Sequence, residues 1–595
     1  MVDISLADTP LFTRAVSATK AGKLVEAEKL CQQIVAARPD FFDAILLLAQ
    51  VQSRLGKLDA ALATYQHALS MWPNAARAHF GCGVLLERLK RYDEALASLD
   101  RALAVRPNFA AALANRGRLL HVLGRFGEAM ASYDRALRLG EDFVIHYDRG
   151  RLLQDLNRPQ EALTSYDRAL ALRPDLVEAL CNRGNVLQAL GRSAEALASY
   201  DRAVELRPDF AEAFSNRGSA LLKLNRYSEA LASFERAITL RPHYSGALSN
   251  RGLVLRQLKR FDEALVSFAE AQSVLPPNAE AHFGEAETLL LRGDFARGWE
   301  KYEWRSQGQF LRHAQRDFAQ PKWLGREEIA GKTMLLHAEQ GLGDTIQFCR
   351  YVPLVAERGA RIVLEVPDSL RQLLGSLAGA ALVVSSGSVL PQFEVQCPLL
   401  SLPLAFGTRI ETIPSKVPYL TASSQRAADW NARLGPRQGL RFGLAWSGRP
   451  HPPNRSVPLR LLLPLLDEKA TFVSLQKDVR PEDASILSER SDFLHFEDAL
   501  TDFSETAALI ANLDLVISID TSVAHLAGAL GKPVWILLQF TPDWRWLLDR
   551  DDSPWYPTAR LFRQDDSRGW DNVIAQVGDA LRNVVITNCR ELLPH

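Results

Sequence analysis

Small, apolar and polar positions recur with one fixed period through the first three hundred residues of the chain. In residues 211–242, AEAFSNRGSALLKLNRYSEALASFERAITLRP, the small Gly218, Ala230 and Ala237 let two helices approach, and Phe234 fills the space between repeats. Prolines recur at 34-residue steps, with one double interval of 67 residues across a degenerate stretch at about 141–173; they are Pro39, Pro73, Pro107, Pro174, Pro208, Pro242 and Pro276. The pattern predicts a stack of helix pairs.

A 34-residue period of helix pairs is that of tetratricopeptide repeats. Glycine recurs at the small position of the first helix, at Gly83, Gly117, Gly150, Gly184 and Gly252. We expect about eight repeats between residues 5 and 305, the first and last of them atypical because terminal repeats cap such a stack. Residues 1–305 are therefore predicted to form an α-solenoid.

The pattern changes after Gly293. Aromatic residues, among them Trp299, Tyr302 and Trp304, are expected to pack the solenoid onto the next domain, and residues 306–332 are predicted to be a docking linker. From residue 333, short β-rich runs alternate with helical ones, as parallel sheets require. Two lobes are predicted, residues 333–425 and 440–595, with a connection at about 422–439.

Each lobe is predicted to be a doubly wound sheet. Strands are expected at TMLLHAEQ, ARIVLEVP, ALVVSSG and FEVQCPLL in the first lobe, and at RFGLAWSG, TFVSLQKD, DFLHFED, LDLVISID and PVWILLQ in the second. Helices are expected at 459–467, 480–489, 503–512 and 523–530. The expected fold class is an α-solenoid followed by an α/β domain of two lobes with a cleft between them, where ligands bind at the carboxyl ends of the strands.

Composition narrows the function classes. Lys plus Arg (70) equals Asp plus Glu (70), so nucleic acid is an unexpected partner. The six cysteines are scattered without CxxC spacing, which favours a reducing compartment over a disulfide framework or a structural zinc site. The first residues lack the pattern of a signal peptide, and no apolar run is long enough to span a membrane. A cytoplasmic location is expected.

One repeat position departs from what packing requires. Four asparagines occupy it, each followed by Arg-Gly: Asn115, Asn182, Asn216 and Asn250. This position should face the inner groove, where an amide can bind the backbone of an extended acceptor peptide. In the alternative interpretation the amides are solvated remnants of the repeat consensus. Asp148 replaces asparagine in the degenerate repeat, and Gly81 and Gly284 replace it at the two ends.

The segment HAEQGLGDTIQF comes after the first strand of the first lobe. Gly341 and Gly343 permit a tight strand-to-helix turn and close approach by a ligand, and the helix dipole favours the charge of Asp344 at the helix start. The segment is therefore predicted to present a carboxylate to the cleft. In the alternative interpretation, Asp344 only caps the helix.

The second lobe carries DTSVAHLAGALGKP after an apolar strand. The free N–H groups of the helix start, together with Asp520, Thr521 and Ser522, form a site suited to a diphosphate, and His525 would add a donor. The alternative is an ordinary helix cap with a buried, satisfied histidine.

Three more residues are expected at the same rim. Arg455 comes after a turn that contains Ser447 and Gly448, and it is a candidate for contact with phosphate or a surface arginine. Gln476 and Lys477 end the next strand; Lys477 could neutralise a diphosphate or pair with Asp478. The Trp-rich stretch 542–556 could stack on a sugar or cover the core of the lobe.

Together, GLGD followed by Pro353, and DTSVAHLAGALGKP, resemble motifs of the ADP-heptose:lipopolysaccharide heptosyltransferase family of inverting glycosyltransferases. Ser522 stands where that family usually has glycine. The resemblance implies the two-lobed GT-B fold, Asp344 as the general base, a donor diphosphate held by Thr521, Ser522 and His525, and Arg455 in the phosphate-contacting loop. It implies no metal, and no DxD motif ends a strand of the first lobe.

The asparagine series resembles the ladder in the superhelix of O-linked N-acetylglucosamine transferase. The two resemblances together imply a protein O-glycosyltransferase that uses a nucleotide-sugar donor and recruits its acceptor protein through the repeats. Flagellin is one candidate acceptor, because chains of this layout modify it with a nonulosonic acid from a CMP donor. The alternatives are a lipopolysaccharide- or glycan-modifying transferase, and a repeat scaffold with an inactive transferase domain. The sugar stays open, and so does the nucleotide, among UDP, ADP, GDP and CMP.

Overall fold

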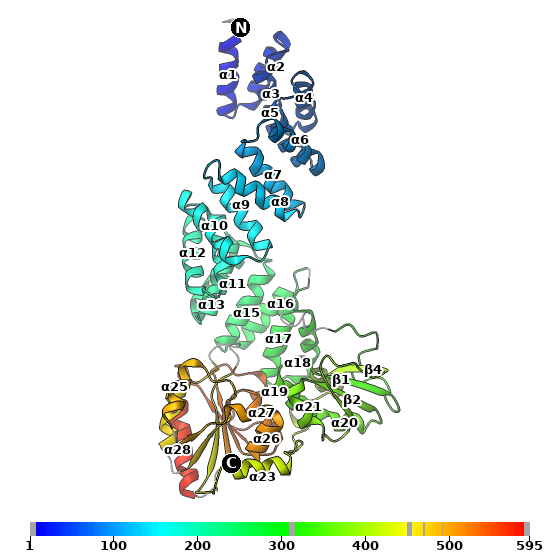
Figure 1. Ribbon diagram of the computed structural model, residues 1–595, viewed down its shortest axis with the longest axis vertical. Helices are drawn as coiled ribbons and strands as arrows, with labels where there is room; N and C mark the ends of the chain where they lie inside the picture. The colour runs from blue at the N-terminus through cyan, green and yellow to red at the C-terminus, as the bar shows by residue number, and fades with distance from the viewer. Residues whose placement is uncertain are drawn as a thin grey trace. The chain divides into compact units, whose positions relative to one another are not determined.

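The computed structural model describes residues 8–275, 277–308, 316–448, 455–467, 470–490 and 492–587. The chain divides into two compact units, Met1–Pro242 and His243–His595. The first unit is entirely helical, whereas the second begins with helices and continues into two parallel sheets (Figure 1). The predicted fold class, an α-solenoid followed by a two-lobed α/β domain, is confirmed.

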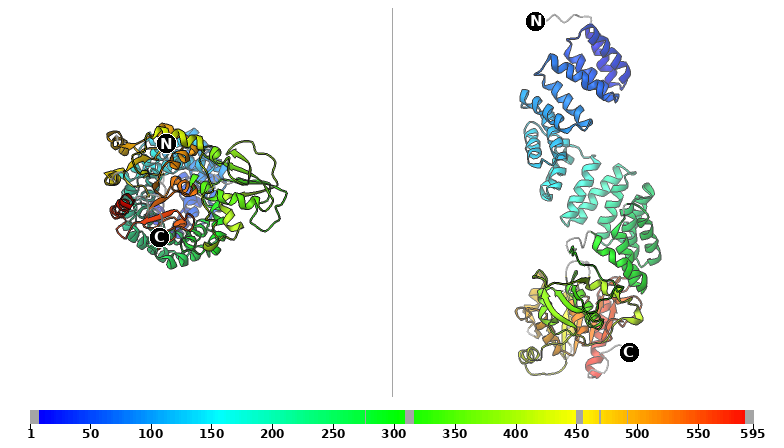
Figure 2. Two further views of the ribbon diagram at one scale, coloured as in Figure 1. Left: turned by 90° about the horizontal axis from the view of Figure 1, so that it is seen from below. Right: turned by 90° about the vertical axis from the view of Figure 1, so that its right-hand side faces the viewer.

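Antiparallel helix pairs make up the solenoid, and in the first unit each pair lies beside the next (Figure 2). The helices of the first unit are α1 Asp8–Lys20, α2 Leu24–Ala37, α3 Phe42–Arg54, α4 Leu58–Met71, α5 Ala76–Arg88, α6 Tyr92–Val105, α7 Ala110–Val122, α8 Phe126–Leu137, α9 Phe143–Asp155, α10 Pro159–Leu172, α11 Val177–Ala189, α12 Ser193–Leu206, α13 Ala211–Lys223 and α14 Tyr227–Leu240. The second unit adds α15 Ser245–Gln257, α16 Phe261–Gln272, α17 Ala279–Leu291 and α18 Phe295–Tyr302. The described residues thus form nine pairs rather than about eight, because the degenerate stretch and both terminal stretches fold as complete pairs.

In the five pairs from α7–α8 to α15–α16, the small position on the first helix meets an aromatic ring on the second. A Cβ added to Gly117 would lie 2.7 Å from the ring of Tyr133, and one added to Gly218 would lie 2.8 Å from the ring of Phe234. Both rings are fully buried. Any larger side chain at these glycines would force the helices apart.

In the first unit, the arginine of each Asn-Arg-Gly run connects successive pairs. Arg116 donates to Asp100 in the preceding pair (2.6 Å) and to Ser132 in its own pair (2.8 Å). Arg217 repeats this arrangement with Asp201 and Ser233, both at 2.6 Å. Two of the three residues in the run, arginine and glycine, are thus accounted for by packing, whereas the asparagine is not.

The first lobe is a four-stranded parallel sheet in the order β3-β2-β1-β4. Its strands are β1 Thr333–His337, β2 Arg361–Val366, β3 Ala380–Ser385 and β4 Val395–Pro398, and its helices are α19 Leu342–Phe348, α20 Val352–Ala356, α21 Asp368–Leu374 and α22 Leu402–Ala405. The strand order reverses between β1 and β4. The loop that contains Gly341 therefore begins at the topological switch point of this sheet.

The second lobe is a six-stranded parallel sheet in the order β10-β9-β8-β5-β6-β7. Its strands are β5 Arg441–Ala445, β6 Thr471–Ser474, β7 Phe493–Leu494, β8 Leu515–Ile519, β9 Val534–Leu538 and β10 Ala559–Arg563, and its helices are α24 Leu459–Leu462, α25 Pro481–Glu489, α26 Phe503–Ala511, α27 Ser522–Ala529 and α28 Asp571–Thr587. This order is that of a dinucleotide-binding sheet, with its switch point between β5 and β8. Alternate strand residues pack on α24 and α28 on one face and on α26 and α27 on the other, as a doubly wound sheet requires.

The connection predicted at 422–439 is largely a helix, α23 Ser424–Arg433. Its Trp430 is buried and donates to Glu505 of α26 at 2.8 Å, and Arg426 pairs with the same carboxylate. The end of the connection is thus part of the second lobe. Packing of Trp430 against α26 is the reason that this segment folds as a helix. The sequence did not predict the helix, because a single tryptophan in a polar stretch gives little periodic signal.

The last helix pair is built into the α/β domain. Trp299 of α18 is 2% exposed, donates to the Thr408 carbonyl oxygen at 3.1 Å, and meets the ring of Trp544 edge to face at 5.1 Å. Trp304, expected to take part in this packing, instead stacks on His282 of α17 at 4.0 Å. The tryptophans at 544, 546 and 555 are buried, which agrees with core covering rather than sugar stacking as the role of that stretch.

We predict that Trp299→Ala lowers the stability of the second unit by about 3–5 kcal/mol, because it empties a fully packed aromatic site. Trp304→Ala is the matched control and should cost only about 1 kcal/mol, since that ring is half-buried and mainly loses one stacking contact. Amide hydrogen exchange in β8 and β9 measures both effects. Equal losses in the two variants would show that Trp299 does not join the solenoid to the domain.

Candidate active site

Both motifs singled out in the sequence lie at switch points of the sheets. The loop 338–341 leaves β1 and enters α19, and Asp520–Thr521 leaves β8 and enters α27. The two helices touch: a Cβ added to Gly343 would lie 3.5 Å from the Cα of Ser522, the first residue of α27. Carboxyl ends of strands from both lobes therefore come together at one place.

Asp344 lies in the first turn of α19. Its Oδ2 accepts the Gly341 N–H at 2.7 Å, and its Oδ1 pairs with the guanidinium of Arg545. Only 20% of the side chain is exposed. Burial raises the pKa of Asp344, Arg545 opposes that rise, and the neighbouring Asp543 adds to it. Asp344 is thus a cap and also one half of a buried ion pair.

Arg545 is the residue that sequence reasoning missed. It stands in the 3₁₀ turn η7, Trp544–Trp546, and its side chain is only 7% exposed. Besides Asp344, it binds Gln347 Oε1 through Nε at 2.6 Å and Asp543 Oδ1 through Nη1 at 2.8 Å. The one signal in the sequence was a cation placed between two tryptophans, which gives no indication of its partners.

Gly341, before α19, and Gly343, in its first turn, have packing roles within the protein. A Cβ on Gly343 would lie 2.8 Å from Cδ2 of His525, so the ring of the other lobe takes the space. A Cβ on Gly341 would lie 2.9 Å from the Asp344 oxygen that its N–H binds. Close packing and the cap account for both glycines.

His525 is also placed differently from the expected diphosphate contact. It is 5% exposed; its Nδ1 lies 3.0 Å from the Tyr556 hydroxyl and its ring stacks on Trp546. Burial and nearby arginines, Arg545 foremost, hold its pKa well below the ordinary value, so the ring is neutral. The structure agrees with the alternative of a buried, satisfied histidine.

The start of α27 gathers the other predicted residues. Arg455 Nη1 lies 3.4 Å from the Asp520 carbonyl oxygen, and a Cβ on Gly448 would lie 3.0 Å from Arg455 Nε. Among the described residues, no side chain caps the helix, and the Thr521 hydroxyl is 3.1 Å from Ser518 Oγ instead. Arg455 and an uncapped helix start thus lie side by side at the switch point of the second sheet, as an anion site requires.

Asp520, the residue after β8, is a second partly buried carboxylate, and like Asp344 it is affected by the charges of Arg545 and Asp543. Burial and the charge of Asp543 raise the pKa of Asp520 to about 6, against the opposing effects of Arg545 and Arg455. Its Oδ1 lies 3.8 Å from Nε2 of His525.

Gln476 and Lys477 lie at the rim but face the protein. Gln476 Oε1 accepts the Ser447 N–H at 3.1 Å and so supports the turn that leads to Arg455. Lys477 donates to the Thr501 carbonyl oxygen at 3.2 Å, and not to Asp478 as one alternative held.

Near Asp344 and the start of α27, some buried N–H donors have no hydrogen-bond partner within the described residues. They include Gln347 Nε2 and Arg455 Nε. Buried donors are normally satisfied, so each calls for an explanation. Phosphate and hydroxyl oxygens are acceptors that would satisfy them. Within the described residues, no group of three or more His, Cys, Asp or Glu side chains is placed to hold a metal ion.

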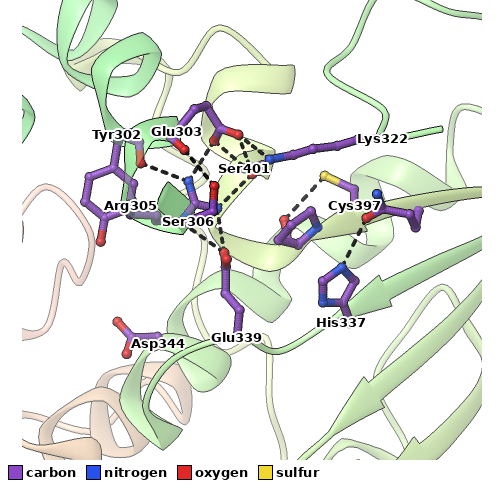
Figure 3. Close-up of polar contacts among 12 residues, drawn as sticks. Tyr302, Glu303, Arg305, Ser306, Lys322, His337, Glu339, Asp344, Cys397 and Ser401 are labelled. Atoms are coloured by element: carbon purple, nitrogen blue, oxygen red, sulfur yellow. Dashed lines mark hydrogen bonds and ion pairs between the residues drawn. The ribbon is translucent and has the colours of Figure 1, made fainter. Parts of the chain in front are cut away.

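The loop that carries Asp344 is also held from the solenoid side. Arg305, in the turn η1 Glu303–Gln307, lies between Glu303 and Glu339 (Figure 3). It donates to Glu303 Oε1 and to Ser401 Oγ, both at 2.8 Å, and pairs with Glu339. Burial would raise the pKa of Glu303, but Arg305 and Lys322 outweigh it and hold that pKa below the ordinary value. The solenoid end therefore supports the β1–α19 loop through a buried, charge-balanced network.

The asparagine series lies on half-buried helix positions. In the first unit, Asn115 Nδ2 donates to the Ala111 carbonyl oxygen at 2.8 Å while its Oδ1 accepts from Arg118 at 2.7 Å. Asn182 lies 3.4 Å from the Tyr147 hydroxyl, and Asn216 donates to Asn185 at 3.1 Å. A peptide would have to exchange these contacts for its own.

A cavity of about 720 Å³ lies elsewhere, where the loops at 259–263 and 291–293 meet residues 547–552 and Ile410. Most of its charges are paired, as in Arg260–Glu263, Arg292–Asp262 and Arg550–Asp552. It contains none of the residues discussed above, so the candidate site rests on the two switch points and not on this cavity.

Comparison with known proteins agrees with this layout. Tetratricopeptide-repeat patterns match residues 46–103, 91–142, 147–211 and 211–244, and the glycosyltransferase family 9 (heptosyltransferase) pattern matches residues 499–565. The latter match spans β8, α27, η7 and β10, and so contains Asp520 and Arg545. Repeat patterns in the first half of the chain, together with the family 9 glycosyltransferase match in the second lobe, support a glycosyltransferase.

Among curated proteins, protein FlbA of Caulobacter vibrioides is 26% identical over 334 residues, which cover 51% of this chain and 55% of FlbA. The chain thus spans about half the length of this relative. Among solved structures, YrrB, a TPR protein with an unusual peptide-binding site, is 29% identical over 31% of this chain and 95% of its own, with a TM-score of 0.29. The thermophilic TPR protein TTC0263 of Thermus thermophilus is 24% identical over 30% of this chain and 99% of its own, with a TM-score of 0.27.

We predict that Gly343→Ala destabilises the domain by about 1–3 kcal/mol, although alanine is the better helix former, because the new methyl group meets His525. Combining it with His525→Ala should recover much of that loss, since the ring is then gone. Gly127→Ala in α8 is the control, because nothing lies within 4 Å of its Cβ position, and it should be neutral or stabilising. Thermal unfolding of the three variants measures this, and additive losses in the double variant would contradict the contact.

Proposed function

We propose that the chain is an inverting, metal-independent glycosyltransferase that moves a sugar from a nucleotide-sugar donor to a protein bound by its repeats. One observation carries the proposal: Asp344, on the first lobe, lies next to the uncapped start of α27 and Arg455, on the second. A base and an anion site are thus adjacent at the switch points of two facing sheets.

The donor binds the second lobe in this proposal. Its diphosphate lies on the N–H groups at the start of α27, with Thr521 and Ser522 beside it and Arg455 as the cation. Asp520 and Gln476 shape the surrounding loops. Within the part of the chain that the structure describes, the Arg455 Nε–H has no hydrogen-bond partner, and an anionic oxygen would satisfy it, which supports this assignment. His525 packs the two helices together and leaves the diphosphate to the other groups.

Transfer then proceeds in one displacement. The acceptor hydroxyl loses its proton to Asp344 while its oxygen forms the new bond to the anomeric carbon, and the bond from that carbon to the nucleotide diphosphate breaks on the opposite face. Charge that develops on the leaving diphosphate is stabilised by Arg455 and the helix start. This electrostatic stabilisation takes the place of a metal ion.

The repeats supply the acceptor. Binding energy gained there, remote from the reacting atoms, positions the hydroxyl at the catalytic residues. The family 9 match and the repeats support a transferase with a protein-binding array, and flagellin is one candidate acceptor. A lipopolysaccharide or another glycan is the alternative, favoured by the heptosyltransferase description of that family.

The five described cysteines are free, which supports a reducing, cytoplasmic setting. None of the described helices combines the length and apolar character needed to cross a membrane.

The variant Asp344→Asn tests the assignment of Asp344 as the general base. The amide still fits the cap but cannot take a proton, so we expect unchanged folding and donor binding with turnover reduced roughly 100-fold or more. Arg455→Met should fail differently, by losing donor affinity, whereas Arg460→Met on the exposed side of α24 should change neither. Donor titration and transfer rates separate these effects, and a fully active Asp344→Asn enzyme would refute the proposed base.

The acceptor is tested by intact-mass analysis of candidate proteins co-expressed with the enzyme. Replacing Asn182, Asn216 and Asn250 together by Ala should weaken acceptor binding by about 1–3 kcal/mol without affecting the donor, on the order of 1 kcal/mol per lost contact. The control replaces Asn74 and Asn108, exposed residues in the turns between repeats. If only a glycan gains mass, or if the two sets of variants bind acceptor alike, the repeats do not recruit the acceptor in this way.

A further inference from the structure

We propose that Arg545 is a positioning residue for Asp344, which it holds from the opposite lobe so that the carboxylate stays oriented and ionised for catalysis. This inference rests on the proposed role of Asp344 as the base. It goes beyond that role because it assigns a function to a loop of the second lobe that contributes none of the predicted site residues.

The guanidinium joins two lobes through three separate groups. Its Nη2 pairs with Asp344 and its Nε binds Gln347, both on α19 of the first lobe, while its Nη1 binds Asp543 beside it in the second lobe. Two contacts on successive turns of α19 fix the orientation of that helix as well as the carboxylate. A single point charge such as a lysine ammonium could not satisfy all three.

Asp344 needs such a partner because most charges around it are negative. Asp543, the residue before η7, and Glu339, in the loop before α19, both raise its pKa. Asp520, which follows β8, is also close to Asp543 and Arg545. Other titratable groups nearby are the neutral His525 of α27, Arg455 at the start of α27, and the buried phenol of Tyr302, whose pKa lies above the ordinary value because of burial. Arg545 is therefore the cation that keeps this carboxylate ionised.

Arg545 itself is held in place before any ligand binds. Its guanidinium lies over the ring of Trp544 at 4.2 Å, and the Asp543 carboxylate accepts both its backbone N–H (3.0 Å) and its Nη1. With 7% of its side chain exposed, it has little freedom to move. Preorganised charges of this kind cost no reorganisation during the reaction.

The test compares two substitutions that replace a charged side chain by an uncharged one and that should shift the pKa of Asp344 in opposite directions. In the acid limb of the kcat profile, activity is lost as pH falls through the pKa of the base. Arg545→Met removes the favourable charge, raises that pKa and should move the limb up by about one to three pH units. Asp543→Asn removes a like charge, lowers that pKa and should move the limb down. Arg545→Lys should fall between Met and the parent enzyme.

Arg550→Gln is the matched control, because this arginine is in the same stretch but pairs with Asp552 on the surface, and it should leave the profile unchanged. Added guanidinium ion should partly restore Arg545→Met at neutral pH, and donor KM should stay near the parent value. If Arg545→Met and Asp543→Asn move the limb in the same direction, or if the profile does not move while both proteins are folded, Arg545 is only a structural bridge.

The two proposals fail differently. A fully active Asp344→Asn enzyme would remove the base itself and thereby the proposed function. An inactive Asp344→Asn enzyme, together with an unmoved acid limb in both Arg545→Met and Asp543→Asn, would leave the base in place and overturn only the assignment of Arg545.

Discussion

The close contact between α19 and α27 is the constraint on which the rest of the site depends. Gly343 lacks a side chain, so the ring of His525 can lie against the space where its Cβ would be, and the two helix starts meet closely. That contact sets where Asp344 stands relative to Ser522, the first residue of α27. A methyl group at this position would disturb both the packing of the two lobes and the spacing between Asp344 and the start of α27.

The close contact between α19 and α27 brings three aspartates near one another, and their negative charges repel. Asp344, Asp520 and Asp543 all lie near one guanidinium, and the pKa of both Asp344 and Asp520 is raised. Carboxylates with pKa values raised by burial and like charge are found at catalytic sites and in structural ion-pair networks. The same crowding makes the site sensitive to any change in the Arg545 loop.

The solenoid end is part of this architecture and not a separate attachment. Arg305 holds Glu339 in the β1–α19 loop, and Trp299 packs on Trp544, the residue next to Arg545. The last helix pair thus reaches the loops on both sides of Asp344. Its contacts explain why the second compact unit contains α15–α18 together with both sheets.

Local patterns in the sequence determined the elements and their order. The 34-residue period required stacked helix pairs, and apolar runs that end in Gly-Asp or Asp-Thr-Ser required parallel strands with functional loops at their carboxyl ends. Arg455, predicted near the start of α27, lies there, because the strand order of such sheets brings the ends of β5 and β8 together. The tertiary structure alone decided that Gly343 makes room for His525 and that Arg545 pairs with Asp344, residues about two hundred positions apart. A period of two or 3.6 residues describes which face of an element is buried, but it carries no information about which distant side chain will lie against that face.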